Sequence, residues 1–486
     1  MLIKTIDLIT KKNTLQWFFA ILLGLFLGFY ILFIFKLPSK WVLYFFLAGV
    51  FPFVALAIGN LRKMLLALIL LDIPLQLDIA LGHYWYLDYT GAINGYLISL
   101  TTICLVILYV LWMLDYLVNK DVASQALRRP NLYLILYLAI TCLSMVTGDN
   151  RRLASFEIFL LVQIFFLYIY VINKIRNKDD LVFILVFLLV GLIGESLIIT
   201  LMQVVGQGFR FAGIMGNIYA NAATPGGDSR IGGTLVSANT AGSYLSMLLA
   251  PAFSILVTHL KKPYKWVGVA AFVCGLIALV LTGSRGAWIA TFISFMIFGI
   301  VAFRKGWLEF RVVVIGAAIG ILIGILFYSP IYERVFSSDS GSAASRVPQN
   351  QIAFQIIKDH PILGVGANNY FNSLSSYLIN NSNNTVFRWV VHNKYLLVWA
   401  ETGIFGLIFF VMFLISTIRQ GFKIVQINDS FLSPLALSFA AAIAGQMVHM
   451  FFDVFHSRPQ VQLLWLVAAL IMVMSQMYKL KQIPDR

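Results

Sequence analysis

Residues 281–290 read "LTGSRGAWIA" and place one arginine, Arg285, among small residues in the middle of an otherwise apolar stretch. A charge deep in a bilayer costs roughly 2.5–3.5 kcal/mol on insertion scales. The small neighbours, Ser284 among them, suit a tight turn that packs against another element. We interpret Arg285 as a cation held at a membrane edge to meet an anionic substrate. The alternative is a short hairpin between two membrane helices.

A second candidate is the segment 207–235, which is rich in Gly, Asn, Ser and Thr and has Arg210 and Arg230 as its cations. The glycine pair at 232–233 would let backbone amides approach an anion closely. Asn239 opens the next helix, where its side chain can cap the helix or donate a hydrogen bond. The alternative is a flexible loop.

His392 precedes a long apolar stretch in "VVHNKYLLVWAETGIFG". Because the pKa of histidine lies near working pH, its ring can accept a proton from an attacking hydroxyl. Glu401 follows nine residues later, too far along a helix for direct contact, so we expect it to orient another group. A capping or core histidine is the alternative.

The segment 329–390 contains an amphipathic helix by its spacing of apolar residues, with Arg346 just ahead of it and Pro361 after it. Such a helix can lie at the membrane interface. A turn is expected after Pro361, at Gly364 and Gly366. The apolar residues are Ile352, Phe354, Ile356 and Ile357.

A few further ionisable residues lie inside apolar runs or at their ends. Glu195 lies inside an apolar run, where a carboxylate is expected to be functional or partnered. Four more cluster further on, at positions His449, Asp453, His456 and Arg458. Their spacing matches no zinc signature, so a metal-independent mechanism without a cofactor is favoured.

Composition shows which elements must position these residues. The chain of 486 residues is 60% hydrophobic and only 11% charged, whereas soluble domains are about one quarter charged. Its cysteines, Cys104, Cys142 and Cys274, lie in apolar runs and are interpreted as small core residues. The basic N-terminal residues followed by an apolar run indicate an uncleaved first helix.

Runs long enough to span a bilayer predict an all-α polytopic membrane protein with about 12–14 transmembrane helices and a large extracytoplasmic loop. The runs are 17–35, 42–58, 64–76, 93–117, 131–147, 154–173, 181–206, 236–258, 266–283, 287–303, 311–328, 391–418, 431–452 and 461–478. We divide the chain into N-terminal spans (1–180), central spans with the glycine-rich loop (181–328), the large outer loop (329–390) and C-terminal spans (391–486).

Lys and Arg concentrate in alternate, short connections, which predicts that both termini are cytoplasmic. The formal net charge of +15 is then a matter of topology, and nucleic-acid binding is not expected. With this orientation every polar segment described above emerges on the extracytoplasmic face.

The motifs together resemble the O-antigen ligase / O-antigen polymerase superfamily over roughly residues 185–475. The resemblance is carried by "LTGSRGAW", by "SANTAGSYL" after Arg230, by "KDHPILGVGANNY" and by "HNKYLLVWAETGIFG". After Arg346 the chain departs from the family pattern, since "VPQNQ" stands where an aromatic residue is common.

This resemblance implies a C-type glycosyltransferase fold in a bacterial inner (plasma) membrane and a role in polysaccharide or lipopolysaccharide biosynthesis for the cell envelope. It implies an undecaprenyl-diphosphate-linked glycan donor, and a glycan or lipid acceptor. Arg285, Arg230 and Arg346, with Arg210 beside them, would hold the diphosphate, and His392 would be the base. Asn239, Ser284, Glu401 and Glu195 would support them.

Three functions stay open at this point. A ligase would join a finished glycan to an acceptor such as lipid A-core, and a polymerase would join lipid-linked repeat units. A transporter would need internal repeats and ionisable groups at the bilayer midplane, and the sequence has no half-to-half repeat.

Overall fold

The computed structural model describes residues 60–88, 90–118, 127–211, 214–219, 230–235, 237–326, 328, 332, 346–378, 389–427 and 429–481. The chain forms two compact units, one of Leu65–Phe209 with Gly216–Arg486 and the other of Met1–Met64 with Arg210–Met215. The predicted spans 17–35 and 42–58 lie outside the described residues.

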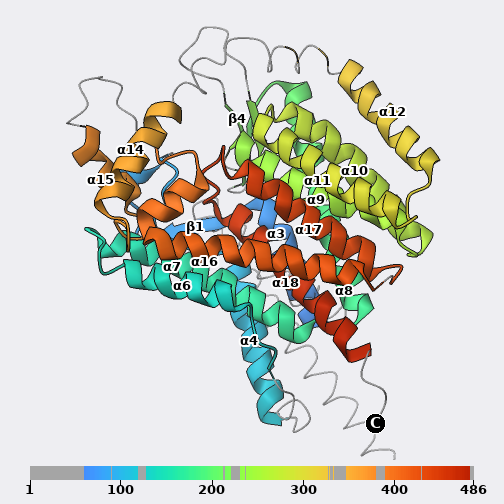
Figure 1. Cartoon of the computed structure of the whole chain (residues 1–486), viewed down its shortest axis with the longest axis horizontal. Coiled ribbons are helices and arrows are strands. Elements are labelled where there is room, and N and C mark those ends of the chain that lie inside the picture. Colours follow the sequence, from blue (N-terminus) through green and yellow to red (C-terminus); the bar gives the residue numbers. More distant parts are fainter. Residues whose placement is uncertain are drawn as a thin grey trace, which may run out of the picture. The chain divides into compact units, whose positions relative to one another are not determined.

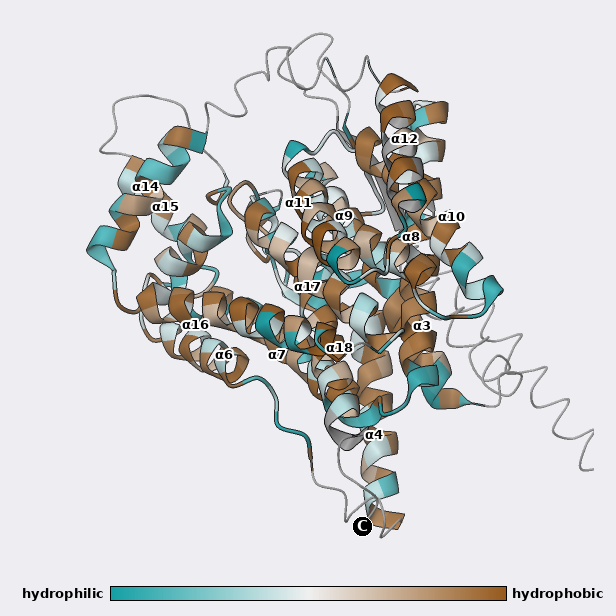
Figure 2. Ribbon diagram, turned by 45° about the vertical axis from the view of Figure 1, so that its right-hand side comes forward, coloured by the Kyte–Doolittle hydropathy of each residue, from teal (hydrophilic) through white to brown (hydrophobic). Residues whose placement is uncertain are grey.

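Within the described residues, nine helices are long and apolar enough to cross a membrane, which confirms the all-α polytopic class (Figure 1). They are α4 (Leu100–Val118), α7 (Arg151–Lys174), α8 (Lys178–Val205), α9 (Ala238–Val257), α10 (Lys262–Leu281), α11 (Arg285–Arg304), α16 (Lys394–Val425), α17 (Leu432–His449) and α18 (Arg458–Lys481). Three predicted spans form shorter helices, α3 (Leu61–Leu75), α6 (Leu132–Ser144) and α12 (Phe310–Leu326). The long helices are largely hydrophobic, as Figure 2 shows.

Short strands lie in the glycine-rich segment, where a loop was the alternative, and at the start of the predicted span 93–117, whose helix begins only at Leu100. β1 (Asp78–Leu81) pairs antiparallel with β2 (Tyr96–Ser99), and the one-turn helix η1 (Trp85–Leu87) lies between them. In the glycine-rich segment, β3 (Phe209–Phe211) and β4 (Ile214–Tyr219) precede β5 (Arg230–Gly233). β4 and β5 pair antiparallel, which gives the strand carrying Arg230 a defined backbone in place of a flexible loop.

Small residues bring α11 and α17 unusually close together. A Cβ added to Gly445 would lie 2.3 Å from the carbonyl oxygen of Ala290. One turn further along α11, Ser294 Oγ donates to the carbonyl of Ala441 at 3.1 Å. Such contacts allow membrane helices to pack backbone against backbone. Ser284, one of the small neighbours of Arg285, is packed as closely, since a Cβ added to Gly242 of α9 would lie 2.9 Å from its Cβ.

The helix α16 is broken at Gly403, whose backbone (φ 72°, ψ −175°) is not helical. A helix break leaves carbonyls and amides unpaired, and in a membrane protein these must find other partners. The loop 361–366 supplies them through three bonds: Val365 N–H to Ala400 O (2.8 Å), Gly366 N–H to Glu401 O (2.9 Å) and Ile404 N–H to Pro361 O (3.0 Å). The "HPILGVG" and "AETG" motifs are thus two halves of one joint.

Two short helices lie on this joint, α14 (Arg346–Asp359) and α15 (Tyr370–Leu378). The helix expected after Arg346 is α14, and its buried residues, Ile352 and Ile356 among them, pack against α15 and the first turns of α16. Phe354, which was assigned to the apolar face, is 55% exposed. The buried residues of α14 are therefore part of the protein core.

Candidate active site

Arg230 is tied to the turn before Arg285 through Asn239. Nη2 of Arg230 donates to Asn239 Oδ1 at 2.8 Å, and Nε donates to the carbonyl of Thr282 at 3.3 Å. Ser284 Oγ donates to the same Asn239 oxygen at 3.1 Å. Residues from β5, α9 and the α10–α11 turn thus form one hydrogen-bonded group.

The position of Asn239 had suggested that its side chain could cap α9, but it does not. Ser237 is the N-cap, and its Oγ accepts from the amide of Thr240 at 3.1 Å. The side chain of Asn239 is therefore available to hold Arg230. It contributes to the candidate site and not to the helix end.

Glu195, buried in α8, fixes the strand that carries Arg230. It accepts the backbone N–H of Thr234 at 2.9 Å and lies within hydrogen-bonding distance of the Thr234 hydroxyl. Gly233 has φ 62°, and a Cβ there would lie 2.0 Å from Glu195 Oε1, so only glycine fits. The amide after the glycine pair is therefore bound by a carboxylate, and this part of the loop does not present that amide to an anion.

His392 is held by Gln349, which lies one turn after Arg346 on α14. Gln349 Oε1 is 3.4 Å from the backbone N of His392 and 3.2 Å from its Nδ1. Since a backbone N–H can only donate, the Gln349 atom that faces it is the oxygen. The same oxygen must then accept from Nδ1–H, so Nε2 keeps its lone pair. His392 is therefore set up as a proton acceptor at Nε2.

Burial lowers the pKa of His392 below its ordinary value of 6.5. The nearby carboxylate of Asp453 opposes this shift, whereas the guanidinium of Arg346 adds to it. A neutral ring at physiological pH follows, as a general base requires. The same interaction shows that Arg346 and His392 lie close together, although 45 residues separate them in the chain.

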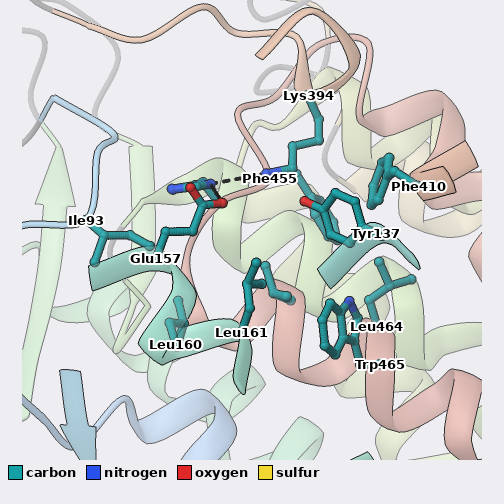
Figure 3. A pocket seen from close by; sticks show the side chains of 12 residues that line it. Ile93, Tyr137, Glu157, Leu160, Leu161, Lys394, Phe410, Phe455, Leu464 and Trp465 are labelled. Atoms are coloured by element: carbon teal, nitrogen blue, oxygen red, sulfur yellow. Dashed lines mark hydrogen bonds and ion pairs between the residues drawn. The ribbon is translucent and has the colours of Figure 1, made fainter. Parts of the chain in front are cut away.

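Glu401 is buried in a second cluster of charged residues, in which the charges of Glu157 and Lys394 act on it. It accepts the backbone N–H of Tyr370 at 3.2 Å, which joins α16 to α15. Lys394, Glu157 and His456 line a small pocket in the same region, and Figure 3 shows Lys394 and Glu157 pointing into it. Glu401 thus orients an element, in keeping with the expectation that it does not touch His392.

Electrostatic contacts bring the separate motifs together. The guanidinium groups of Arg230 and Arg346 both act on the imidazole of His449, the last residue of α17. A Cβ added to Gly286, the neighbour of Arg285, would lie 2.6 Å from His449 Cδ2. His449 therefore stands where β5, the start of α11 and the start of α14 converge. Arg210 lies in β3, in the smaller unit, and its side chain is outside the described residues.

Two residues at this site were not identified from the sequence as functional. Gln349 carries a signal only in retrospect, since it follows Arg346 by one helical turn. His449 was noted only as part of a cluster without a zinc signature. Within the residues that the structure describes, no three His, Cys, Asp or Glu side chains gather in a way that could hold a metal ion.

Comparison with known proteins finds one family that matches part of the chain. Residues 270–411 match the family model described as O-antigen ligase, and no curated protein matches the chain. The matched segment contains Arg285, Arg346 and His392, while Arg230 and His449 flank it. The chain is thus a multi-pass membrane protein in which residues 270–411 are similar to the O-antigen ligase family.

Proposed function

We propose that this protein is an O-antigen ligase-type glycosyltransferase of the bacterial inner membrane. It transfers a glycan from an undecaprenyl-diphosphate carrier to a hydroxyl of a surface acceptor, on the extracytoplasmic face, with both termini in the cytoplasm. The observation that carries the proposal is the convergence of Arg230, Arg346 and the α11 start next to His449, with neutral His392 beside Arg346.

The arginines suit a diphosphate leaving group. Negative charge grows on the phosphate oxygens as the bond from the sugar to the diphosphate breaks. Guanidinium groups stay protonated and bind such oxygens in a bidentate manner, and their effect is large in a site of low dielectric. In this proposal Arg230, Arg285 and Arg346 hold the diphosphate. Asn239 and Ser284 keep Arg230 in place.

His392 provides the base. The acceptor oxygen attacks C1 of the reducing-end sugar and forms the new C–O bond, while the bond between C1 and the diphosphate oxygen breaks. The acceptor proton moves to His392 Nε2 and from there to solvent. A single displacement of this kind inverts the configuration at C1. The charges are balanced by protein side chains, so the proposed reaction proceeds without a metal ion.

Gel analysis of surface glycans in a deletion strain tests the function. If the protein is a ligase, full-length polymer accumulates on the lipid carrier and surface attachment is lost. If single repeat units remain attached to the acceptor, the protein is instead a polymerase. Accumulation of neither species, with unchanged surface glycan, would contradict both. Transfer by purified protein in EDTA tests metal independence, and activity that returns only with added divalent ion would overturn it.

A further inference from the structure

The Nδ1 atom of His449 has no hydrogen-bond partner among the residues that the structure describes. The side chain is 1% exposed, and its Nδ1 is buried without a partner among the described residues. Other polar side chains along the same helix are paired, such as Gln446, which bonds to both Ser243 and Ser246. A buried polar atom without a partner is costly, and such atoms need an explanation.

The surroundings of His449 indicate what its partner is. The charges of Arg230 and Arg346, which come from two different segments, act on the ring, and the carboxylate of Asp453 acts on it as well. Gly286 lies against the ring and leaves no space for a side chain between His449 and the start of α11. A hydrogen-bond donor with the charges of two arginines acting on its ring is suited to an anion with several oxygens, because both kinds of group can then bind the same ligand.

We propose that His449 is a further residue of the diphosphate-binding site, and that its Nδ1–H donates a hydrogen bond to a phosphate oxygen of the lipid carrier. The proposal rests on the function proposed above and adds a binding residue outside the segment that matches the family model. His449 holds the ligand together with the arginines, whereas His392 accepts the proton.

Three variants separate binding from structure. His449→Leu removes the donor, and His449→Asn keeps an N–H close to the position of Nδ1. His259→Leu, at an exposed position, is the matched control for loss of a histidine. Each purified full-length protein is titrated in nanodiscs with undecaprenyl diphosphate, with inorganic pyrophosphate as competitor, and its unfolding temperature is measured with and without ligand.

We expect His449→Leu to weaken binding of undecaprenyl diphosphate by about 10- to 100-fold, the usual range for a hydrogen bond to a charged group. We expect Asn to restore most of the affinity and competition by pyrophosphate to weaken in parallel. Without ligand, His449→Leu should unfold at the same temperature as the wild type or higher, because an unpartnered polar group is removed. Gly286→Ala, which crowds the ring, should also weaken binding.

The outcomes distinguish this proposal from the function on which it rests. If the wild type does not bind undecaprenyl diphosphate, the proposed function itself is wrong. If the wild type binds and His449→Leu binds equally well, only the role of His449 is wrong. A lower unfolding temperature without ligand, with no recovery in the Asn variant, would assign His449 a structural role. A loss confined to the lipid ligand, with unchanged pyrophosphate competition, would also overturn the contact.

Discussion

The burial of His392 and the charges around it determine how the proposed base responds to pH. Burial and the charge of Arg346 lower the pKa of His392 below 6.5 in the folded protein. The unfolded chain therefore binds this proton more tightly, and the stability that the neutral ring contributes is present above pH 6.5 and is lost as the pH falls below it. The neutral form of His392, which the reaction needs, is also present above pH 6.5.

The first prediction concerns the pH dependence of glycan transfer. The acid limb of kcat/KM should lie below pH 6.5, because His392 stays neutral until its lowered pKa is reached. Gln349→Glu places a carboxylate beside the ring, stabilises the imidazolium form and should move the limb to higher pH. Gln355→Glu, at an exposed position of the same helix, is the control and should leave the limb in place. An acid limb above pH 6.5 in the wild type would contradict the assignment.

The second prediction concerns Arg285. Arg285→Ala should reduce transfer by about 100-fold or more, since loss of one donor to a developing negative charge typically costs that much. Arg285→Lys should retain part of the activity, because it keeps the charge but loses the bidentate geometry. Arg304→Ala, at the other end of α11 and exposed, is the matched control. Equal rates for the two alanine variants, measured on protein of equal membrane content, would remove Arg285 from the reaction.

At the scale of elements, the joint between α16 and the loop 361–366 determines where α14 places Arg346 and Gln349. The broken turn at Gly403 uses its free carbonyls to hold the loop. Asn368 then fastens the next residues to the β1–β2 connection, where its side chain exchanges hydrogen bonds with Ile93 at 2.8 Å. The "HPILGVG" and "AETG" motifs thus fix the positions of His392 and Arg346 relative to each other.

The third prediction tests this joint. A Cβ on Gly403 would lie 1.8 Å from the carbonyl oxygen of Ile362, and the residue has positive φ. Gly403→Ala should therefore destabilise the fold by more than about 3 kcal/mol and lower the unfolding temperature sharply. Gly299→Ala is the control, because that helical glycine has open space around it, and alanine should add about 0.5–1 kcal/mol. Similar unfolding temperatures for the two variants would show that the joint tolerates a side chain.

The sequence allowed the helices and the order of the motifs to be predicted because apolar length and residue type are local signals. The same is true of the tight packing around Arg285, which its small neighbours indicated. The contact of Gln349 with His392 joins residues 43 positions apart, and no local pattern specifies it. The pairing of β4 with β5 was missed because glycine and threonine in the segment also suit a loop. His449 was missed because only the fold brings the charges of Arg230 and Arg346 and the start of α11 near its ring.

At the scale of the whole molecule, a buried cluster of charges connects the His392 segment to the helical core. Lys394 Nζ is 3.1 Å from His456 Nδ1, and the charges of Glu157 and Glu401 also act on this ammonium group. Burial and the Lys394 charge lower the pKa of His456 well below its ordinary value, so its neutral ring accepts from Lys394. The 3.7 Å approach of His456 to Glu157 is therefore not an ion pair. One cation thus holds α7, α16 and the connection before α18 together.

The last prediction follows from this charge balance. Lys394→Met leaves buried carboxyl groups without their cation and should destabilise the protein by about 3–5 kcal/mol, with loss of transfer because the segment of His392 is no longer fixed. Adding Glu157→Gln removes one of the uncompensated charges, so the double variant should recover a large part of the lost unfolding temperature. Lys423→Met, exposed near the end of the same helix, should leave stability and transfer unchanged. Thermal unfolding of the purified variants measures each step. If Glu157→Gln lowers the stability of Lys394→Met further, the two groups are not a charge pair, and a neutral network holds the His392 segment instead.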